Sequence, residues 1–248
     1  MTKPLTTSQN PLVVEFVGLP GSGKTTVSHL VTSKLKAKGI KIISREEILQ
    51  QWHQQKVLQK LLKLFSSNSN QWNILRDSLI FAAQVKPINL QSFLRAGKVF
   101  VNVKRNDDVV DAGNCQIILL EQGLLQTVWS IVITGSLPQL SYPKRAMTDL
   151  FDNRSIAVIN CNIDLNTAVS RIKNRPRKKK KDSYFDLMDS KSLHYLLTKY
   201  FPYLQEIVHC AQTAKIPILE VDSSVTVEEN SEKIVSWIVN QISGSYQE

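Results

Sequence analysis

The chain has 248 residues, of which 42% are hydrophobic and 21% are charged, and its formal net charge at pH 7 is +10. This composition excludes a wholly disordered chain and is typical of a globular α/β domain with its own apolar core. The surplus of positive charge favours a polyanionic partner, which is a phosphorylated small molecule, a nucleic acid or an acidic membrane surface.

The sequence shows no sign of export, membrane insertion or a zinc centre. Residues 1–10 are polar and are expected to form a flexible tail rather than a signal peptide. No run approaches 18 consecutive apolar residues, so no transmembrane helix is predicted. The three cysteines are far apart and the four histidines lack metal-ligand spacing. Cys115 and Cys161 sit in apolar runs and are expected to be small core residues, and a cytoplasmic location is expected.

The first predicted elements form a βαβ unit. Apolar, β-branched residues predict a buried strand over 12–17, and apolar residues at spacings of three and four predict a helix over 24–38. Gly39 is expected to end this helix, and a second short strand is predicted over 40–44. The order strand, glycine-rich turn, helix and strand is typical of a parallel sheet.

The later strands, predicted over 116–120, 156–161 and 217–221, are apolar throughout. Helices are predicted over 46–84 with a break at 66–70, and over 124–134, 165–174, 186–213 and 227–242. Strands without polar alternation are buried on both faces. The sequence therefore predicts an α/β fold in which helices cover both faces of a five-stranded parallel sheet. Residues 11–248 are expected to form one domain, although 88–114 show no clear pattern.

Residues 18–25, Gly-Leu-Pro-Gly-Ser-Gly-Lys-Thr, match the phosphate-binding motif G-x-x-x-x-G-K-[ST] in full. The glycines allow torsions that turn backbone N–H groups toward an anion, and the following helix adds its positive dipole end. Lys24 is expected to bind the β- and γ-phosphates, Thr25 to ligate Mg²⁺ and Thr26 to face the α-phosphate. The motif predicts binding of ATP or GTP with Mg²⁺. Its predicted nucleotide-binding residues are Gly18, Pro20, Gly21, Ser22, Gly23, Lys24, Thr25 and Thr26.

A carboxylate, Glu121, follows the strand predicted over 116–120. An acid at the carboxyl end of a buried strand points into the crevice where doubly wound sheets bind ligands. Glu121 is therefore expected to hold Mg²⁺ through water or to accept a proton from a substrate hydroxyl. The alternative is an ordinary strand-end acid at the surface.

In this order, the segments resemble those of the thymidylate kinase and deoxynucleoside kinase group of P-loop kinases. Ile43-Ser-Arg45-Glu46-Glu47 resembles the Arg-Glu segment that these kinases place near the phosphate acceptor. Leu119-Leu-Glu121-Gln-Gly lies where the family has an acid that is commonly followed by Arg. The resemblance implies a nucleotide-kinase-like P-loop fold, phosphoryl transfer from ATP and a mobile lid.

Two further segments carry the resemblance on the nucleotide side. Residues 164–175 resemble the helix that leads into the lid, with Arg171 and Arg175 in R-x-x-x-R spacing. Val221-Asp-Ser-Ser224 resembles the loop that wraps the adenine base, which implies that Asp222 and Ser223 bind the nucleotide. Since the P-loop contains no Arg, a transition-state arginine must come from the lid.

The lid is predicted over about 171–185 and is basic. Helical spacing of four puts Arg171 and Arg175 on one face, and Pro176 then breaks the helix, which suits a hinged loop. Arginines that close over a transferring phosphoryl group stabilise its charge. Three other interpretations compete: Lys178–Lys181 form a solvated face, residues 175–181 form a nuclear localisation signal, or the basic run contacts a nucleic-acid backbone.

The sequence thus predicts an ATP- and Mg²⁺-dependent kinase of a small acceptor, with a nucleotide or nucleoside favoured. The predicted catalytic residues are Lys24, Glu121, Arg171 and Arg175, the metal ligands are Thr25 and Glu121, and the acceptor candidates are Arg45, Glu46 and Arg76. One alternative is a nucleotide-binding regulatory module with little or no kinase activity, motivated by Gln122 where the family commonly has Arg. Another is a polynucleotide 5′-end kinase, which is not favoured because basic and aromatic residues are not interleaved. The oligomeric state stays open, with a homodimer as one candidate.

Overall fold

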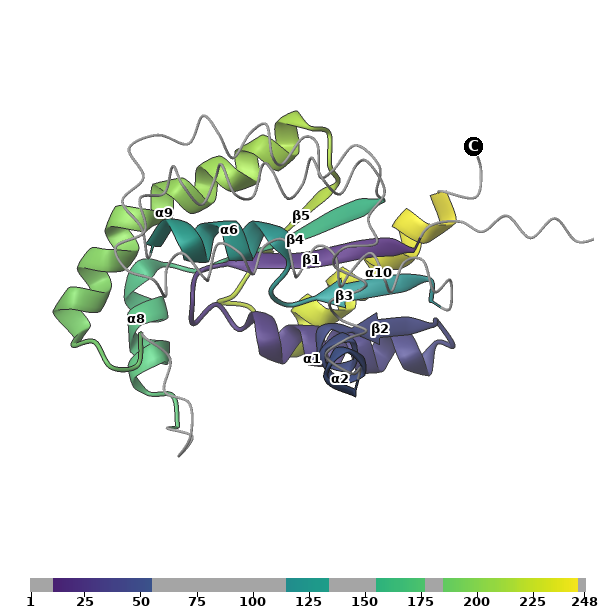
Figure 1. The fold of residues 1–248 in the computed structure, drawn as a ribbon, viewed down its shortest axis with the longest axis horizontal. Helices are drawn as coiled ribbons and strands as arrows, with labels where there is room; N and C mark the ends of the chain where they lie inside the picture. The colour runs from purple at the N-terminus through teal and green to yellow at the C-terminus, as the bar shows by residue number, and fades with distance from the viewer. Residues whose placement is uncertain (1–10, 55–114, 134–154, 177–184, 245–248) are drawn as a thin grey trace, which may run out of the picture.

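The computed structural model describes residues 11–54, 115–133, 155–176 and 185–244. Within them, a parallel sheet of five strands lies between two layers of helices (Figure 1). The strands are β1 (Leu12–Gly18), β2 (Ile42–Ser44), β3 (Ile117–Leu120), β4 (Ile156–Asn162) and β5 (Ile218–Asp222). The helices are α1 (Lys24–Ala37), α2 (Arg45–Gln54), α6 (Leu124–Ile133), α8 (Leu165–Lys173), α9 (Ser190–Thr213) and α10 (Val227–Gly244). The predicted α/β class and the parallel five-stranded sheet are confirmed.

The strand order is β2-β3-β1-β4-β5, and every neighbouring pair is parallel. β1 is the central strand, with Glu15 opposite Leu120 of β3 and Val158 of β4. Because all strands run the same way, their carboxyl ends meet at one edge of the sheet. The turn after β1, the end of β3 and the turn after β5 therefore lie together there, which is where open α/β sheets bind ligands.

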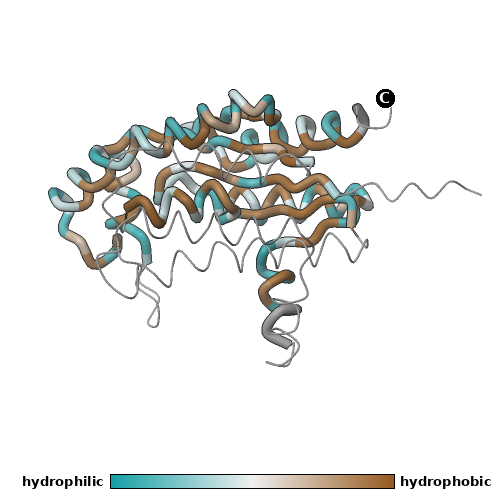
Figure 2. Tube along the Cα trace, turned by 45° about the horizontal axis from the view of Figure 1, so that its top comes forward, coloured by the Kyte–Doolittle hydropathy of each residue, from teal (hydrophilic) through white to brown (hydrophobic). Residues whose placement is uncertain are grey.

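The core consists of two large apolar clusters, one on each face of the sheet, and a smaller third cluster around Ile48 of α2 and Ile118 of β3. Val14 and Phe16 of β1 point to the face that α1 and α10 cover, and both side chains are fully buried. Val17 points to the opposite face, where it packs in a cluster with residues of α6, α8 and α9. Figure 2 shows the strands as an apolar centre, with hydrophilic residues interspersed along the helices that cover them. Burial on both faces explains why the strands lack polar alternation.

Local signals set the helix ends. After α1, Gly39 has φ 78°, which is the left-handed conformation that ends helices, and the Ile40 N–H donates to the Leu35 carbonyl (3.2 Å). The Asp164 side chain accepts a hydrogen bond from the Thr167 N–H at the start of α8. Each of these helices therefore begins or ends within a residue or two of its predicted boundary.

The helix predicted over 186–213 differs from the structure at its start. Residues 185–188 form turns, and α9 begins at Ser190 because Asp189 accepts a hydrogen bond from the Ser192 N–H (2.9 Å). α9 then continues for 24 residues with Pro202 inside it. Of the region predicted to be helical over 46–84, only α2 falls within the described residues.

The structure bears on the sequence predictions about cysteines and membrane helices, while several other predictions stay untested. All three cysteines are buried and free, which confirms the expectation for Cys115 and Cys161. None of the helices in the described ranges is both long enough and apolar enough to cross a membrane. The tail over 1–10 and the run Lys178–Lys181 lie outside the described residues, and the one-domain organisation and cytoplasmic location stay predictions.

Candidate nucleotide-binding site

The turn between β1 and α1 has the geometry of a phosphate cradle. Gly23 has φ 80°, a conformation that glycine adopts without strain, and α1 starts at the next residue. No side chain caps this end of α1. The first N–H groups of the helix therefore point toward the turn with the positive end of the helix dipole, which favours an anion.

Lys24 lies across this turn. Its ammonium donates to the Gly18 carbonyl (2.7 Å), to the Leu19 carbonyl (2.8 Å) and to the Ser22 hydroxyl (3.3 Å). The pKa of Lys24 is lowered to about 8, mainly by burial and in part by the nearby Arg175 guanidinium, while Glu121 opposes the shift. A buried ammonium held by neutral oxygens gains more from a charged phosphate oxygen, so Lys24 is suited to bind one.

A cleft of about 1060 Å³ opens beside the turn and brings most of the predicted site residues together. Those lining it are Pro20, Gly21, Ser22, Gly23, Lys24, Thr25, Thr26, Glu121, Arg171, Arg175 and Ser223. Gly18 is not among them, since its N–H donates to the Gln126 side-chain carbonyl (3.1 Å) at the buried base of the turn. Asp222 also lies outside the lining, and its carboxylate instead accepts the Ser224 N–H (2.8 Å).

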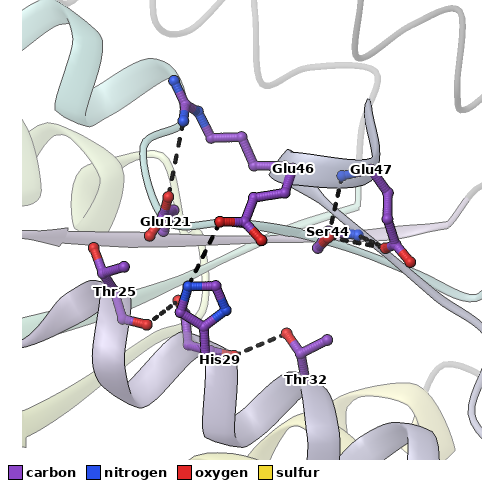
Figure 3. Close-up of polar contacts among 9 residues, drawn as sticks. Thr25, His29, Thr32, Ser44, Glu46, Glu47 and Glu121 are labelled. Carbon is purple, nitrogen blue, oxygen red and sulfur yellow. Dashed lines mark hydrogen bonds and ion pairs between the residues drawn. The ribbon is translucent and has the colours of Figure 1, made fainter. Parts of the chain in front are cut away.

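Glu121 stands at the end of β3 and faces the cleft, as its position in the sequence predicts. Its Oε1 lies 3.8 Å from Nη1 of Arg45, and only 14% of its side chain is exposed. Its Oε2 is buried and has no hydrogen-bond partner. Figure 3 shows Glu121 and Thr25 on neighbouring elements, and both line the same cleft. A buried carboxylate oxygen without a partner, near a threonine hydroxyl, is a donor set that suits Mg²⁺.

Protein ligands for a metal are few. In the described ranges no group of three His, Cys, Asp or Glu side chains is arranged to hold an ion. This fits Mg²⁺ bound to a nucleotide, because such sites use one or two protein oxygens and the phosphates supply the others. Glu121 and Thr25 would be those protein ligands.

In the segment after β2, Arg45 does not line the cleft but reaches Glu121, which does, whereas its neighbours make other contacts. Glu46 is exposed and lies 3.7 Å from His29 Nε2, as Figure 3 shows. Glu47 accepts hydrogen bonds from the Ser44 N–H (2.7 Å) and hydroxyl (2.9 Å), which fixes the start of α2. Arg76, the third acceptor candidate, lies outside the described residues.

The loop after β5 forms the opposite wall and is tied to the P-loop through Ser223. The Ser223 hydroxyl donates to the Ser22 carbonyl (2.8 Å), and its N–H donates to the Asn162 carbonyl (2.8 Å). The Arg171 guanidinium donates to the Ser223 carbonyl (2.9 Å). Asn230 of α10 closes the loop with a hydrogen bond to the Asp222 carbonyl (2.7 Å). Arg171 thus supports the loop wall in this structure, and Arg175 lines the cleft beside Lys24.

Sequence reasoning missed several residues of the site. Gln126, Trp129 and Asn230 line the cleft, and Glu15 lies buried beneath it with its carboxylate on the start of α6. The signal for Gln126 and Glu15 was present: each is a polar residue inside an otherwise apolar segment. Asn230 carries no such signal, because it contacts a loop that only the fold brings to it.

Comparison with known proteins gives a match to a family and likenesses to solved structures. The sequence matches the NB-ARC domain over residues 1–139, which is more than half of the chain. A solved structure of deoxyadenosine kinase from M. mycoides with bound dATP shares 19% sequence identity with a TM-score of 0.49. The alignment covers 91% of this chain and 98% of that chain, and at this score it says nothing about substrate. No curated protein has a significantly similar sequence.

Proposed function

This chain belongs to the NB-ARC domain family, and from that premise we propose that it binds ATP with Mg²⁺ and transfers a phosphoryl group to a small acceptor. Nucleosides and nucleotides are the favoured acceptor class, in keeping with the resemblance of its segments to thymidylate kinases and deoxynucleoside kinases. The complete P-loop motif and the family match support nucleotide binding. The other residues of the cleft, described next, support the phosphoryl-transfer step.

The observation that carries the proposal is Glu121 Oε2, a buried carboxylate oxygen without a partner on the wall of a cleft of about 1060 Å³. Ligand pockets commonly measure about 300–1,000 Å³, so this cleft has room for a nucleotide and a second small molecule. Burying a carboxylate oxygen without a partner is costly, and such groups concentrate at functional sites. A structural role alone would leave that cost without compensation.

Each residue then has a role in transfer. Lys24 would exchange its carbonyl partners for the β- and γ-phosphate oxygens, and Thr25 and Glu121 would hold Mg²⁺. Magnesium, when bound, neutralises charge on the phosphate oxygens. The oxygen of the acceptor hydroxyl would form a bond to the γ-phosphorus while the bond between that phosphorus and the β,γ-bridging oxygen breaks; ADP would leave, and the hydroxyl proton would pass to solvent. Arg175, which already lines the cleft, would stabilise the equatorial oxygens.

The test is ADP release from Mg·ATP, measured against a panel of nucleosides and nucleoside monophosphates. We expect one class of acceptor to stimulate release and Lys24→Ala to abolish the stimulation. Lys38→Ala is the matched control, because Lys38 is exposed at the far end of the same helix. Stimulation that persists undiminished in Lys24→Ala would contradict the assigned site.

A second candidate is a nucleotide-binding regulatory module with little or no transfer activity. It is favoured by the family match and by Gln122, an exposed amide that lines the cleft where the resembled kinases commonly have Arg. It predicts ATP binding that no small acceptor stimulates in the same panel. A 5′-end kinase would instead be stimulated by an oligonucleotide, and its binding would weaken steeply with salt.

A further inference from the structure

Glu15 is a carboxylic acid in the middle of the central strand. It is 2% exposed, and its strand neighbours on the same side and opposite are apolar. A carboxylate in such a place costs free energy unless it is hydrogen-bonded. The partners of Glu15 therefore indicate what the residue does.

Both carboxylate oxygens accept hydrogen bonds from the first turn of α6. Oε2 accepts from the Leu124 N–H (2.9 Å), and Oε1 accepts from the Gln126 N–H (3.0 Å). These N–H groups have no partner inside their own helix, and an anion at this end of a helix is favourable. Glu15 thus anchors the start of α6 from a strand more than 100 positions away in the sequence.

The turn before α6 packs closely against the Glu15 side chain. A Cβ atom on Gly123 would lie 2.4 Å from Cδ of Glu15 and 2.6 Å from its Oε2. Only glycine allows this approach. On the other side of the turn, Leu120 at the end of β3 is the register partner of Glu15. Glu121 therefore sits in a short link whose two ends are both fixed at Glu15.

The same contacts reach the phosphate loop. Gln126, whose N–H donates to Glu15, accepts the Gly18 N–H on its side-chain oxygen (3.1 Å). The start of α6 and the first residue of the P-loop are therefore joined through Gln126 by buried hydrogen bonds. Glu121 precedes that helix start, Thr25 follows the P-loop, and both line the cleft.

We propose that Glu15 is a positioning residue for the metal site: its carboxylate, packed on Gly123 and bonded to the start of α6, fixes the orientation of Glu121 toward Thr25. This inference rests on the proposed Mg²⁺–nucleotide function. A purely structural Glu15 would affect folding stability and leave metal affinity unchanged. A positioning role affects metal affinity in protein that is fully folded.

The test measures the binding of Mn²⁺, a paramagnetic substitute for Mg²⁺, in the presence of a non-hydrolysable ATP analogue. Electron paramagnetic resonance reports how much Mn²⁺ is bound. We expect Glu15→Gln to weaken Mn²⁺ binding by about tenfold, the lower end of the loss usual for residues that orient metal ligands. Affinity for the analogue without metal should change less than twofold. Asp189→Asn is the matched control, because Asp189 also accepts an N–H at a helix start and lies away from the cleft.

A second variant alters the contact between Gly123 and Glu15 from the Gly123 side. Gly123→Ala places a methyl group against the Glu15 carboxylate, so it should also weaken Mn²⁺ binding, with folding of both variants verified by circular dichroism. Wild-type affinity for Mn²⁺ in either folded variant would overturn the positioning role and leave the proposed function standing. Failure of the wild-type protein to bind Mn²⁺ with the analogue would overturn the proposed function itself.

Discussion

The two ends of the cleft differ in how completely their polar groups are paired. At the nucleotide end, the Ser223 hydroxyl, N–H and carbonyl all have partners, and Asn230 closes the loop. At the end that we propose for the acceptor, Arg45 and Glu121 are 3.8 Å apart, and Glu121 Oε2 has no hydrogen-bond partner. The polar groups of the loop wall at Ser223 are therefore paired before any ligand arrives, while a carboxylate oxygen at the proposed acceptor end is open to a metal or a reacting group.

This difference indicates that one end contributes mainly to nucleotide affinity and the other mainly to turnover. Preorganised walls lose little entropy on binding and so contribute affinity. A buried carboxylate oxygen without a hydrogen-bond partner is costly in the free protein and becomes useful only when a metal or a reacting group supplies its partner. We therefore expect substitutions at the acceptor end to affect turnover, and substitutions at the nucleotide end to affect nucleotide affinity.

Among the substitutions that compare the two ends of the cleft, the largest effect is expected from Glu121→Gln. Replacing the charged Oε2 by a neutral amide should lower turnover by about 100-fold at saturating ATP, because a metal ligand worth several kcal/mol is lost. Affinity for ATP without metal should be nearly unchanged. The coupled ADP-release assay measures both proteins, with Glu220→Gln as a control, since Glu220 lies exposed on β5 and bonds to Asn160 and Asn162. Equal loss in the two variants would argue against a special role for Glu121.

Glu15, which lies buried beneath the cleft, should make the free energy of unfolding depend on pH. Burial raises the pKa of Glu15 from 4.5 to about 7, and N–H bonds from α6 oppose the shift. The folded protein thus holds this proton more tightly than the unfolded chain does. The resulting stabilisation is fully present below pH 4.5 and is lost as pH rises to about 7, a change of about 3 kcal/mol.

Glu15→Gln removes this titration, so the variant should gain stability relative to wild type as pH rises through that window. Urea unfolding of both proteins at pH 5 and pH 8 measures the change in the difference between their free energies of unfolding. Curves that keep the same separation at both pH values would show that Glu15 does not titrate in this range.

Nucleotide affinity should fall as Lys24 loses its proton. Because burial lowers its pKa to about 8, affinity for ATP without metal should decrease above pH 8, approaching tenfold for each further unit. Titration calorimetry at pH 7, 8 and 9 gives the profile. Lys24→Arg keeps its charge throughout and should show a flat profile, although with weaker binding. A wild-type profile as flat as that of the variant would contradict the assignment.

The smallest effect is expected at the paired wall. Ser223→Ala removes one buried hydrogen bond to the Ser22 carbonyl, worth about 1 kcal/mol, so the Kd for ATP should rise about fivefold with turnover unchanged. Ser231→Ala is the control, since the buried Ser231 hydroxyl also donates to a backbone carbonyl, that of Glu228, and Ser231 does not line the cleft. If Ser223→Ala instead reduced turnover, the proposed separation between the two ends of the cleft would be wrong.

Much of the fold could be predicted because its signals are local. The glycine turn, the helix starting at Lys24 and the apolar run before Glu121 each lie within a few neighbouring residues. The pattern of apolar residues predicts a start for α9 that is four residues too early, because the cap at Asp189 is set by a single side chain and leaves no periodic signal. The predicted role of Arg171 at the phosphates stays a prediction, and no local pattern indicates its hydrogen bond to Ser223.

The sequence by itself determined the P-loop, the parallel sheet and the acid at the end of β3, because hydrophobic periodicity and glycine torsions act between near neighbours. Only the tertiary structure decided which polar groups meet. Ser223 reaches Ser22 across 201 positions, and Glu15 reaches Gln126 across 111. Such contacts depend on strand order and register, which place the carboxyl ends of separate strands at one edge. The polar residues inside apolar segments were visible in the sequence, but their partners were not.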